Sequence, residues 1–230
     1  MQASTDKHYI LNYTLGQKTS DTSLLKDHIN DHIESYDTIP ESLTADAGYG
    51  SEENYDFLEE KGITAFVKYG YFDKQQRDRK YAGNPFNVDN LYYNSETNTI
   101  TCPIGQPMTY IGDRTRKTAN GFIQTHRLYQ ARNCEGCPMR GPCHNATGNR
   151  IIQRSPNLTR HRQKIRELLE SEEGNERRKQ RWKVEAVFGN IKQNKGFRRF
   201  MLRGLEKVTT EVGLLAIAHN LQRFSLPTSS

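Results

Sequence analysis

The stretch that decides the fold is Ser42-Leu-Thr-Ala-Asp-Ala-Gly-Tyr-Gly-Ser-Glu-Glu-Asn-Tyr-Asp-Phe-Leu-Glu-Glu-Lys-Gly-Ile-Thr-Ala-Phe-Val67. Its two ends, 42–46 and Ile63–Val67, are short runs that each predict a strand. Between them, Ser51 precedes two glutamates, which is the pattern of a helix N-cap and first turn, and a glycine ends the helix. The order strand, helix, strand predicts a βαβ unit with Asp46 at the end of its first strand.

The position of Asp46 is chemically informative. Open α/β sheets place their ligands beyond the carboxyl ends of their strands, and Asp46 stands at such an end. The alternative is a turn-forming aspartate, because Gly48 and Gly50 follow closely and predict a tight turn. Both interpretations remain open on these residues alone.

The flanking sequence extends this pattern. His8–Leu15 predicts one strand, and Asp21 is a predicted N-cap for a helix that ends near Tyr36. From Tyr69 to Ile152, short pieces of aromatic and turn residues predict a small β-rich insert. Three helices are then predicted, at 158–172, 175–194 and 205–224. The last carries an apolar stripe that predicts core packing: Val208, Val212, Leu215, Ala218 and Leu221. We expect an α/β protein with helices at its C-terminal end.

The second of these helices contains Arg181-Trp-Lys-Val-Glu-Ala-Val-Phe-Gly-Asn-Ile-Lys192. Arg181, Glu185 and Lys192 are separated by four and seven residues, so a continuous helix would place all three on one face together with Phe188. A surface ion-pair ladder is the simplest explanation for a helical glutamate between two cations.

The spacing R-x3-E-x6-K resembles the signature Y-x2-R-x3-E-x6-K of a group of bacterial insertion-sequence transposases of the DDE type. Arg181, Glu185 and Lys192 match it, whereas Arg178 stands at the tyrosine position. The segments 194–208 and 43–50 are also similar to that group. The resemblance covers nearly the whole chain and identifies it as the C-terminal portion of such a transposase.

This resemblance implies an RNase H-like core in which two aspartates and one glutamate hold two Mg²⁺ or Mn²⁺ ions. Asp46 would be the second aspartate and Glu185 the glutamate, with Arg181 and Lys192 as further catalytic residues. The implied reaction is DNA cleavage and strand transfer. Two metal ions suit this chemistry because they stabilise both the attacking and the leaving oxygen of an in-line displacement.

The N-terminal part does not supply the whole core. An RNase H-like sheet has three strands before its first helix, and the first strand, which lies in the centre, carries the first aspartate. Here only His8–Leu15 predicts a strand, and Asp6 follows no apolar run. We therefore expect a truncated and inactive copy, without the first aspartate, the central strand or the DNA-recognition domain usual in such transposases.

The four cysteines are Cys102, Cys134, Cys137 and Cys143, all within 42 residues. Four thiolates at this spacing favour a structural zinc site, in which His144 could replace the last cysteine. Free thiols and a redox pair at the CxxC are the alternatives, and no thioredoxin-like sequence supports the latter.

Charge is distributed unevenly. Lys and Arg number 33 against 27 Asp and Glu, and Arg150–Lys207 alone holds 17 against 7, a local net charge of +10. A basic segment of this kind predicts a DNA-binding face, or else a solvated surface around a core that includes Phe197 and Phe200. The predicted DNA contacts are Lys183, Lys195, Arg198, Arg199 and Arg203.

The predicted domains are 1–68, a partial RNase H-like core; 69–155, the β-rich insert with the cysteines; and 156–230, the helical part of the core. Expected partners are DNA at the ends and target of the element and a second copy of the chain, with no membrane. We expect a bacterial cytoplasmic, nucleoid-associated protein, because no apolar run suits a bilayer or a signal peptide. The competing function is a non-catalytic, zinc-stabilised DNA-binding remnant.

Overall fold

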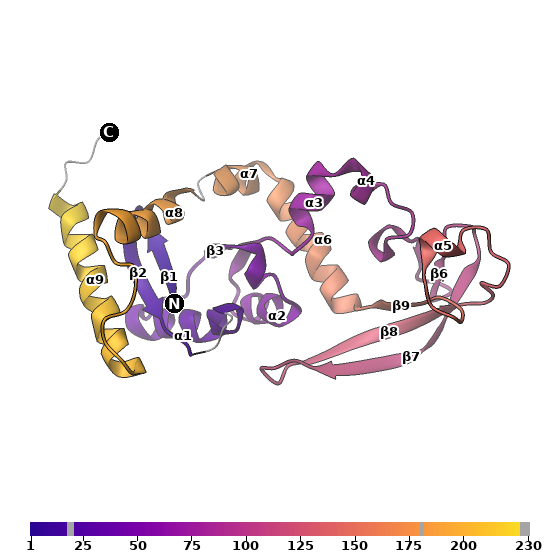
Figure 1. Ribbon diagram of the computed structural model, residues 1–230, viewed down its shortest axis with the longest axis horizontal. Coiled ribbons are helices and arrows are strands. Elements are labelled where there is room, and N and C mark those ends of the chain that lie inside the picture. Colours follow the sequence, from indigo (N-terminus) through magenta and orange to yellow (C-terminus); the bar gives the residue numbers. More distant parts are fainter. Residues whose placement is uncertain (18–20, 180–181, 226–230) are drawn as a thin grey trace. The chain divides into compact units, whose positions relative to one another are not determined.

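The computed structural model describes residues 1–17, 21–179 and 182–225. The chain divides into two compact units (Figure 1). The first unit contains Met1–Lys68 and Glu167–Ser230, and the second contains Tyr69–Arg166. No helix among the described residues is both long enough and apolar enough to cross a lipid bilayer.

Two separate pairs of strands form the sheets of the first unit. Strands β1 (Gln2–Asp6) and β2 (Tyr9–Thr14) are antiparallel, whereas β3 (Ser42–Ala45) and β4 (Thr64–Val67) are parallel. Each pair is a two-stranded sheet. The parallel pair confirms the predicted βαβ unit.

The prediction of one strand before the first helix was wrong, because β1 precedes β2. Lys7 and His8 connect the two strands with φ of 46° and 71°, and Asp6 pairs with Tyr9. Two central residues with positive φ form the hairpin turn that matches strand twist, which usually contains Asn or Gly. Lys7-His8 lacks those residues, so no local pattern marks the hairpin.

The helices of the first unit follow the predicted order with shifted bounds. A 3-10 turn over Asp21–Leu24 precedes the first helix, whose N-cap is Leu24 without a capping side chain, so Asp21 is not the N-cap. The helices are α1 (Leu25–Tyr36), α2 (Glu52–Glu60), the end of α6 (Pro156–Glu170), α7 (Glu172–Lys179), α8 (Trp182–Gly189) and α9 (Leu205–Ser225).

Helix α2 begins and packs as the sequence predicts. The Ser51 side chain accepts a hydrogen bond from the backbone N–H of Asn54 at 3.2 Å, which is the expected N-cap. Tyr55 and Leu58 are buried beneath the parallel strands, and the Tyr55 hydroxyl donates to the carbonyl of Val67 at 3.0 Å. These contacts fix α2 against β4.

The face that α9 buries differs from the predicted stripe. Val212 is buried, but Ala218 and Leu221 are exposed, and the side chains buried beside Val212 are Ala216 and His219. The helix has apolar residues on all sides, so periodicity alone does not select the packed face.

Polar contacts with β2 select it instead. The Asn220 side chain accepts a hydrogen bond from the backbone N–H of Ile10 and donates one to its carbonyl, both at 2.9 Å. A ring nitrogen of His219 lies 2.9 Å from the carbonyl oxygen of His8. These bonds satisfy backbone groups of β2 and of the turn before it, and they orient α9.

The second unit contains the predicted β-rich insert together with three short helices, α3 to α5, that were not predicted. Its antiparallel sheet has the order β5-β6-β7-β8-β9. The strands are β5 (Tyr93–Asn94), β6 (Thr99–Thr101), β7 (Pro107–Lys117), β8 (Ile123–Ala131) and β9 (Ile151–Arg154). The helices are α3 (Phe72–Arg77), α4 (Arg79–Ala82), α5 (Arg140–Cys143) and the first part of α6.

The core of this sheet is small and lies at one end of it. Ile100, Met108, Tyr129 and Ile152 are almost fully buried in one cluster. The hydroxyl of Tyr129 donates to the Asn98 side chain at 2.8 Å, so the largest core residue keeps its polar atom satisfied.

A buried histidine in the first unit lacks a partner on one nitrogen. His28 on α1 is 1% exposed, and its Nδ1 lies 2.9 Å from Oγ1 of Thr14, which donates at 2.8 Å to the Asp31 carboxylate. Because the Thr14 proton goes to Asp31, Nδ1 must carry the imidazole proton. Nε2 is buried without a hydrogen-bond partner. Burial lowers the pKa of His28 to about 4, against the raising effect of Asp31.

We expect His28 to make folding stability depend on pH. Its pKa is about 4 in the native state and 6.5 in the unfolded state, so the unfolded state binds the proton first. The contribution of His28 to the free energy of unfolding is therefore fully present above pH 6.5. It is lost as the pH drops toward 4, by about 3 kcal/mol in total. Denaturant unfolding between pH 7 and 4 should show this loss, and His28→Gln should remove it. The matched variant His32→Gln on the same helix should keep it, and an equal loss in both variants would contradict the assignment.

Candidate functional site

Asp46 directly follows β3 and begins a tight turn. Its backbone is extended, with φ of −69° and ψ of 160°, and a 3-10 turn over Ala47–Tyr49 follows. The Asp46 carbonyl accepts a hydrogen bond from the N–H of Tyr49 at 2.9 Å, and the residue is exposed. The predicted strand end and tight turn are both present, and this turn bond uses the main-chain carbonyl of Asp46.

The buried side chain of Asn54 holds this turn in place. Its amide donates to the carbonyl of Tyr49 at 2.9 Å and to that of Thr22 at 3.2 Å. The same residue donates its backbone N–H to the cap Ser51. One amide therefore ties the loop after Asp46 to the first turn of α2 and to the segment before α1.

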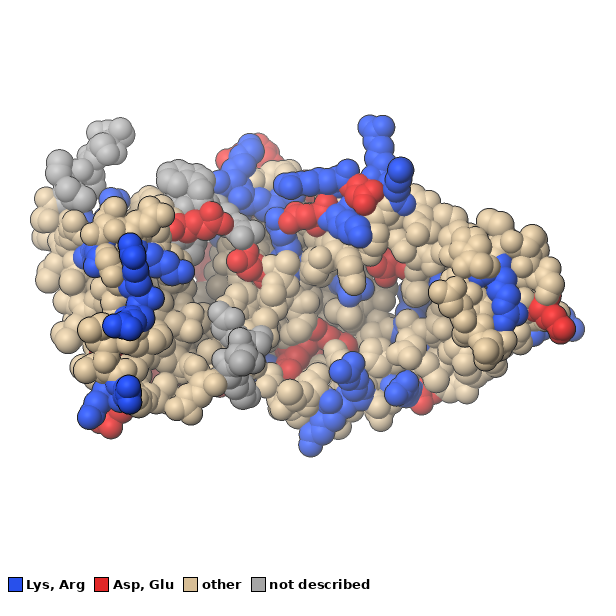
Figure 2. Space-filling view, in the orientation of Figure 1, with Lys and Arg blue, Asp and Glu red and all other residues tan. Residues whose placement is uncertain are grey.

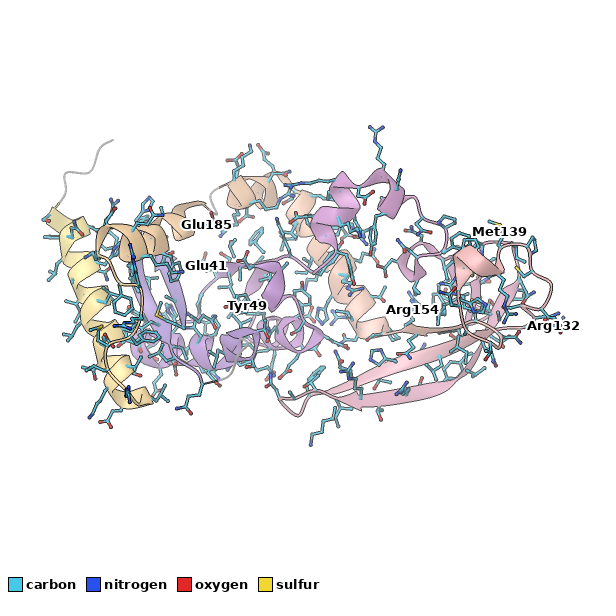
Figure 3. All side chains as sticks on the ribbon, in the orientation of Figure 1. Glu41, Tyr49, Arg132, Met139, Arg154 and Glu185 are labelled. Carbon is cyan, nitrogen blue, oxygen red and sulfur yellow. The ribbon has the colours of Figure 1, made fainter. Side chains whose placement is uncertain are left out.

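Glu185 lies in the first turn of α8 and is exposed, as labelled in Figure 3. Two residues further on, Val187 is 2% exposed and packs with Ile10, Ile191 and Ala216. Side chains two positions apart on a helix point in different directions, so burial of Val187 leaves Glu185 outward. The helix that carries the glutamate is thus anchored on β2 and α9.

Asp46 and Glu185 belong to the same unit. Among the described residues, no three His, Cys, Asp or Glu side chains are grouped closely enough to hold a metal ion. Asp6 ends β1 and is exposed. Neither Asp46 nor Glu185 is therefore part of a group of three possible ligands in the part of the chain that the structure describes.

The predicted cations flanking Glu185 are placed only in part. Arg181 lies outside the described residues. Lys192 is exposed, but it stands in a π-helical turn over Asn190–Asn194 that follows the end of α8. The prediction of one continuous helical face was therefore wrong beyond Gly189, because a π turn holds more residues than an α turn.

The predicted DNA contacts lie on and after this helix. Lys183 is in α8, with its side chain outside the description, and Lys195 is half-buried after the π turn. Arg198, Arg199 and Arg203 are exposed in a segment without regular structure. Figure 2 shows Lys and Arg dispersed over the visible face among Asp and Glu, without one continuous basic patch.

The two aromatic residues in this tract have different roles. Phe197 is half-buried and packs against the cluster that contains Val187 and Ile191. Phe200 is 42% exposed, with its ring 5.7 Å from that of Phe197. The core interpretation therefore holds for Phe197, whereas Phe200 presents its ring to solvent.

All four cysteines line one cavity in the second unit. Its volume is about 20 Å³, enough for one water-sized atom. Cys102 follows β6, Cys134 and Cys137 follow β8, and Cys143 ends α5. His144 and Met139 also line the cavity, and Figure 3 labels Met139 there. The thiols form no disulfide.

Side-chain bonds bring the distant Cys102 to the others. The Gln106 amide donates to the carbonyl of Asn133 at 3.0 Å and accepts from its N–H at 2.7 Å. The backbone N–H of Gln106 also donates to the sulfur of Cys102 at 3.3 Å. This pair of bonds joins the turn after β6 to the loop that contains Cys134.

Arg150 and His144 complete the lining. The guanidinium of Arg150 donates to the sulfur of Cys143 at 3.2 Å and to the carbonyl of Phe86 at 2.6 Å, and its backbone N–H donates to Cys134 at 3.4 Å. Both ring nitrogens of His144 are buried without a hydrogen-bond partner. Burial, together with Arg140 and Arg150, lowers the pKa of His144 below its ordinary value.

Several residues that build these sites were not identified from the sequence. Asn54 stands at the third helical position, from which side chains can reach back to the preceding turn, and this was the one available signal. Gln106 bonds to a residue 27 positions away, and Arg150 to one 64 positions away. Partners at such separations leave no local pattern.

Comparison with known proteins places the chain in a family. A family model described as a transposase DDE domain matches residues 101–225, more than half of the chain. The matched range includes the four cysteines and Glu185 but not Asp46. No curated protein and no solved structure matches the chain. The chain belongs to the transposase DDE domain family.

Proposed function

We propose that this chain contributes Asp46 and Glu185 to the active site of an insertion-sequence transposase that cleaves DNA and transfers its strands. The observation that carries the proposal is an exposed Glu185 on a well-anchored helix inside the matched range. Asp46 supports it from the end of a parallel strand in the same unit. Family membership implies DNA as the partner, and two copies of the chain would act on the two ends of the element.

Asp46 and Glu185 would supply part of a ligand set for Mg²⁺ or Mn²⁺. These ions prefer carboxylate oxygens, which Asp46 and Glu185 supply, but the set lacks a third carboxylate among the described residues. When bound, such ions stabilise charge on the oxygens of the phosphodiester. The contribution of the chain is positional: Asn54 fixes the turn after Asp46, and Val187 holds the helix of Glu185. Arg181 and Lys192 would contact the phosphates.

A further strand would complete both the sheet and the donor set. Among the described residues, β1 pairs only with β2, and β3 only with β4. An extended segment antiparallel to β1 and parallel to β3 would join them in the order β2-β1-strand-β3-β4. The carboxyl end of this segment would then lie at the same end of the sheet as Asp46. A carboxylate there would become the third ligand. The described residues alone would therefore be inactive in cleavage.

The cysteine cavity suits a structural Zn²⁺ ion, which we include in the proposal. Cys102, Cys134, Cys137 and Cys143 all line it, and four thiolates form a closed tetrahedral site. The sulfurs are not grouped at metal distance as they stand, so binding would draw them together. His144, whose ring nitrogens have no partner, is the substitute ligand.

The zinc-stabilised DNA-binding remnant is the competing function. It shares the cysteine cavity and the exposed arginines with the transposase, and it differs in needing no metal at the carboxylates. DNA binding that depends on salt but is equally strong with and without Mg²⁺, together with no cleavage by any form of the chain, would favour it.

Cleavage of supercoiled plasmid in Mg²⁺ or Mn²⁺ tests the active site. We expect no nicking by the chain alone. Nicking should appear when the chain is extended by the residues encoded in frame upstream of Met1, if these supply the missing strand. In the extended protein, Asp46→Ala or Glu185→Ala should lower the rate about 100-fold or more, because each removes a metal ligand.

The matched control is Glu60→Ala. Glu60 is an exposed carboxylate at the far end of α2 from the Asp46 turn, so its loss should leave nicking unchanged. Nicking by the unextended chain that Asp46→Ala abolishes would show that the site is already complete and would contradict the proposal of a missing strand.

Metal analysis tests the zinc site. We expect one Zn²⁺ per chain, and zinc at a hundredfold excess over its Kd should raise the free energy of unfolding by about 2.7 kcal/mol. Cys137→Ser should weaken binding in either ligand set. Cys143→Ser and His144→Ala form a matched pair, because only the true fourth ligand lowers zinc affinity when removed. Protein purified without zinc that binds none on titration would overturn the assignment.

A further inference from the structure

The β7–β8 hairpin extends beyond the rest of its sheet. The last residue of β7 that pairs with β6 is Thr109, and the last of β8 that pairs with β9 is Arg127. From there to the turn, β7 and β8 pair only with each other, as Figure 1 shows. Four residues of each strand, 114–117 of β7 and 123–126 of β8, pair with nothing else and make this free ribbon about 13 Å long.

The ribbon is a well-defined hairpin. Its turn closes through the N–H of Thr118, which donates to the carbonyl of Phe122 at 2.8 Å, with Gly121 at a φ of 89°. At the base, a bulge between Tyr110 and Gly112 interrupts the register. Bulges increase the right-handed twist of a strand pair, so the ribbon leaves the sheet as a twisted pair.

Pairing assigns the side chains to two faces. Arg114 lies opposite His126 and Arg116 lies opposite Gln124, and directly paired residues share a face. All four side chains donate hydrogen bonds, and none is a carboxylate. Both arginines are exposed. This face, Arg114, Arg116, Gln124 and His126, is named the arginine face.

On the opposite face, the charged side chains near the base of the ribbon interact with tyrosines. Hydrogen bonding with Tyr129 raises the pKa of Arg127, and hydrogen bonding with Asp113 raises that of Tyr110. Towards the turn, Lys117 lies opposite Ile123, which is 64% exposed. The two faces therefore differ in chemistry as well as in direction.

The charge of the second unit favours a polyanion. Tyr69–Arg166 contains 16 Lys and Arg against 6 Asp and Glu, a net charge of +10 in a chain whose total is +6. The free ribbon, residues 114–126, contains three Lys and Arg and no Asp or Glu. The carboxylates of the chain are concentrated in the other unit.

We propose that the ribbon lies in the major groove of duplex DNA with its arginine face against the base edges. This inference rests on the proposed function only in taking DNA as the partner. The major groove, about 12 Å wide, admits a two-stranded ribbon, and strands are known to read bases there. Arginine pairs with guanine in two hydrogen bonds and glutamine pairs with adenine in two. The alternation Arg114, Arg116 and the facing Gln124 supplies these groups at successive positions along one face.

Two adjacent residues make a matched test. Arg116 and Lys117 are neighbours on opposite faces, and replacing either by alanine removes one positive charge near the turn. Binding to a labelled duplex should weaken about 10-fold for Arg116→Ala and less than about 3-fold for Lys117→Ala. Arg116→Lys keeps the charge but loses the two-bond geometry. On a duplex sequence selected for tight binding by the unmodified protein, it should therefore weaken binding as much as Arg116→Ala does. Equal effects of the two alanine variants would overturn the groove proposal.

Binding to modified duplex DNA tests whether the ribbon occupies the major groove. A duplex whose cytosines carry glucosylated hydroxymethyl groups has a filled major groove, and the protein should bind it at least about 10-fold more weakly, whereas the minor-groove ligand netropsin should not compete. Competition by netropsin and tolerance of glucosylation would overturn the proposal. Failure of the unmodified protein to bind any duplex would instead defeat the proposed function. The control variant Glu60→Ala should bind as the unmodified protein does.

Discussion

Main-chain hydrogen bonding is the constraint on which the first unit depends. Its strands form two pairs, and the outer edge of β2 is met by the Asn220 side chain, which bonds to both backbone groups of Ile10. No described strand occupies the second edge of β1 or β3. Strand edges inside an α/β core are normally paired, since unpaired N–H and C=O groups are costly once water is excluded. The open edges and the missing carboxylate therefore have one explanation in the proposed additional strand.

Local signals explain which parts of the fold were predictable. The βαβ unit followed from Ser51, two glutamates and a glycine, which act within a few residues of the helix ends. Strand β1 was missed because its turn, Lys7-His8, adopts positive φ without the residues that usually mark it. The packed face of α9 was misjudged because Asn220 and His219 orient it through bonds to residues more than 200 positions away. Sequence periodicity contains no information about such partners.

In the candidate sites, too, features that depend on neighbouring residues were predictable, and features that depend on distant partners were not. Clustering of Cys134, Cys137 and Cys143 along the chain predicted a common location, which the cavity confirms. The approach of Cys102 depends on the bonds between Gln106 and Asn133 across 27 positions, which no spacing rule reveals. The Glu185 face was extended wrongly to Lys192, because a π turn changes the helical repeat after Gly189.

In the proposed function, charge separates DNA binding and DNA cleavage between the two units. The unit with Asp46 and Glu185 has a net charge of −4, and the unit with the ribbon has +10. Carboxylates that attract divalent cations also repel the phosphates of DNA until those cations bind. On this proposal, the affinity for DNA comes mainly from residues away from the carboxylates, such as Arg114 and Arg116. Binding and cleavage would then be separable. Removing a proposed carboxylate ligand would stop the chemistry but leave the electrostatic attraction, whereas removing a ribbon arginine would weaken attachment without changing the proposed metal ligands.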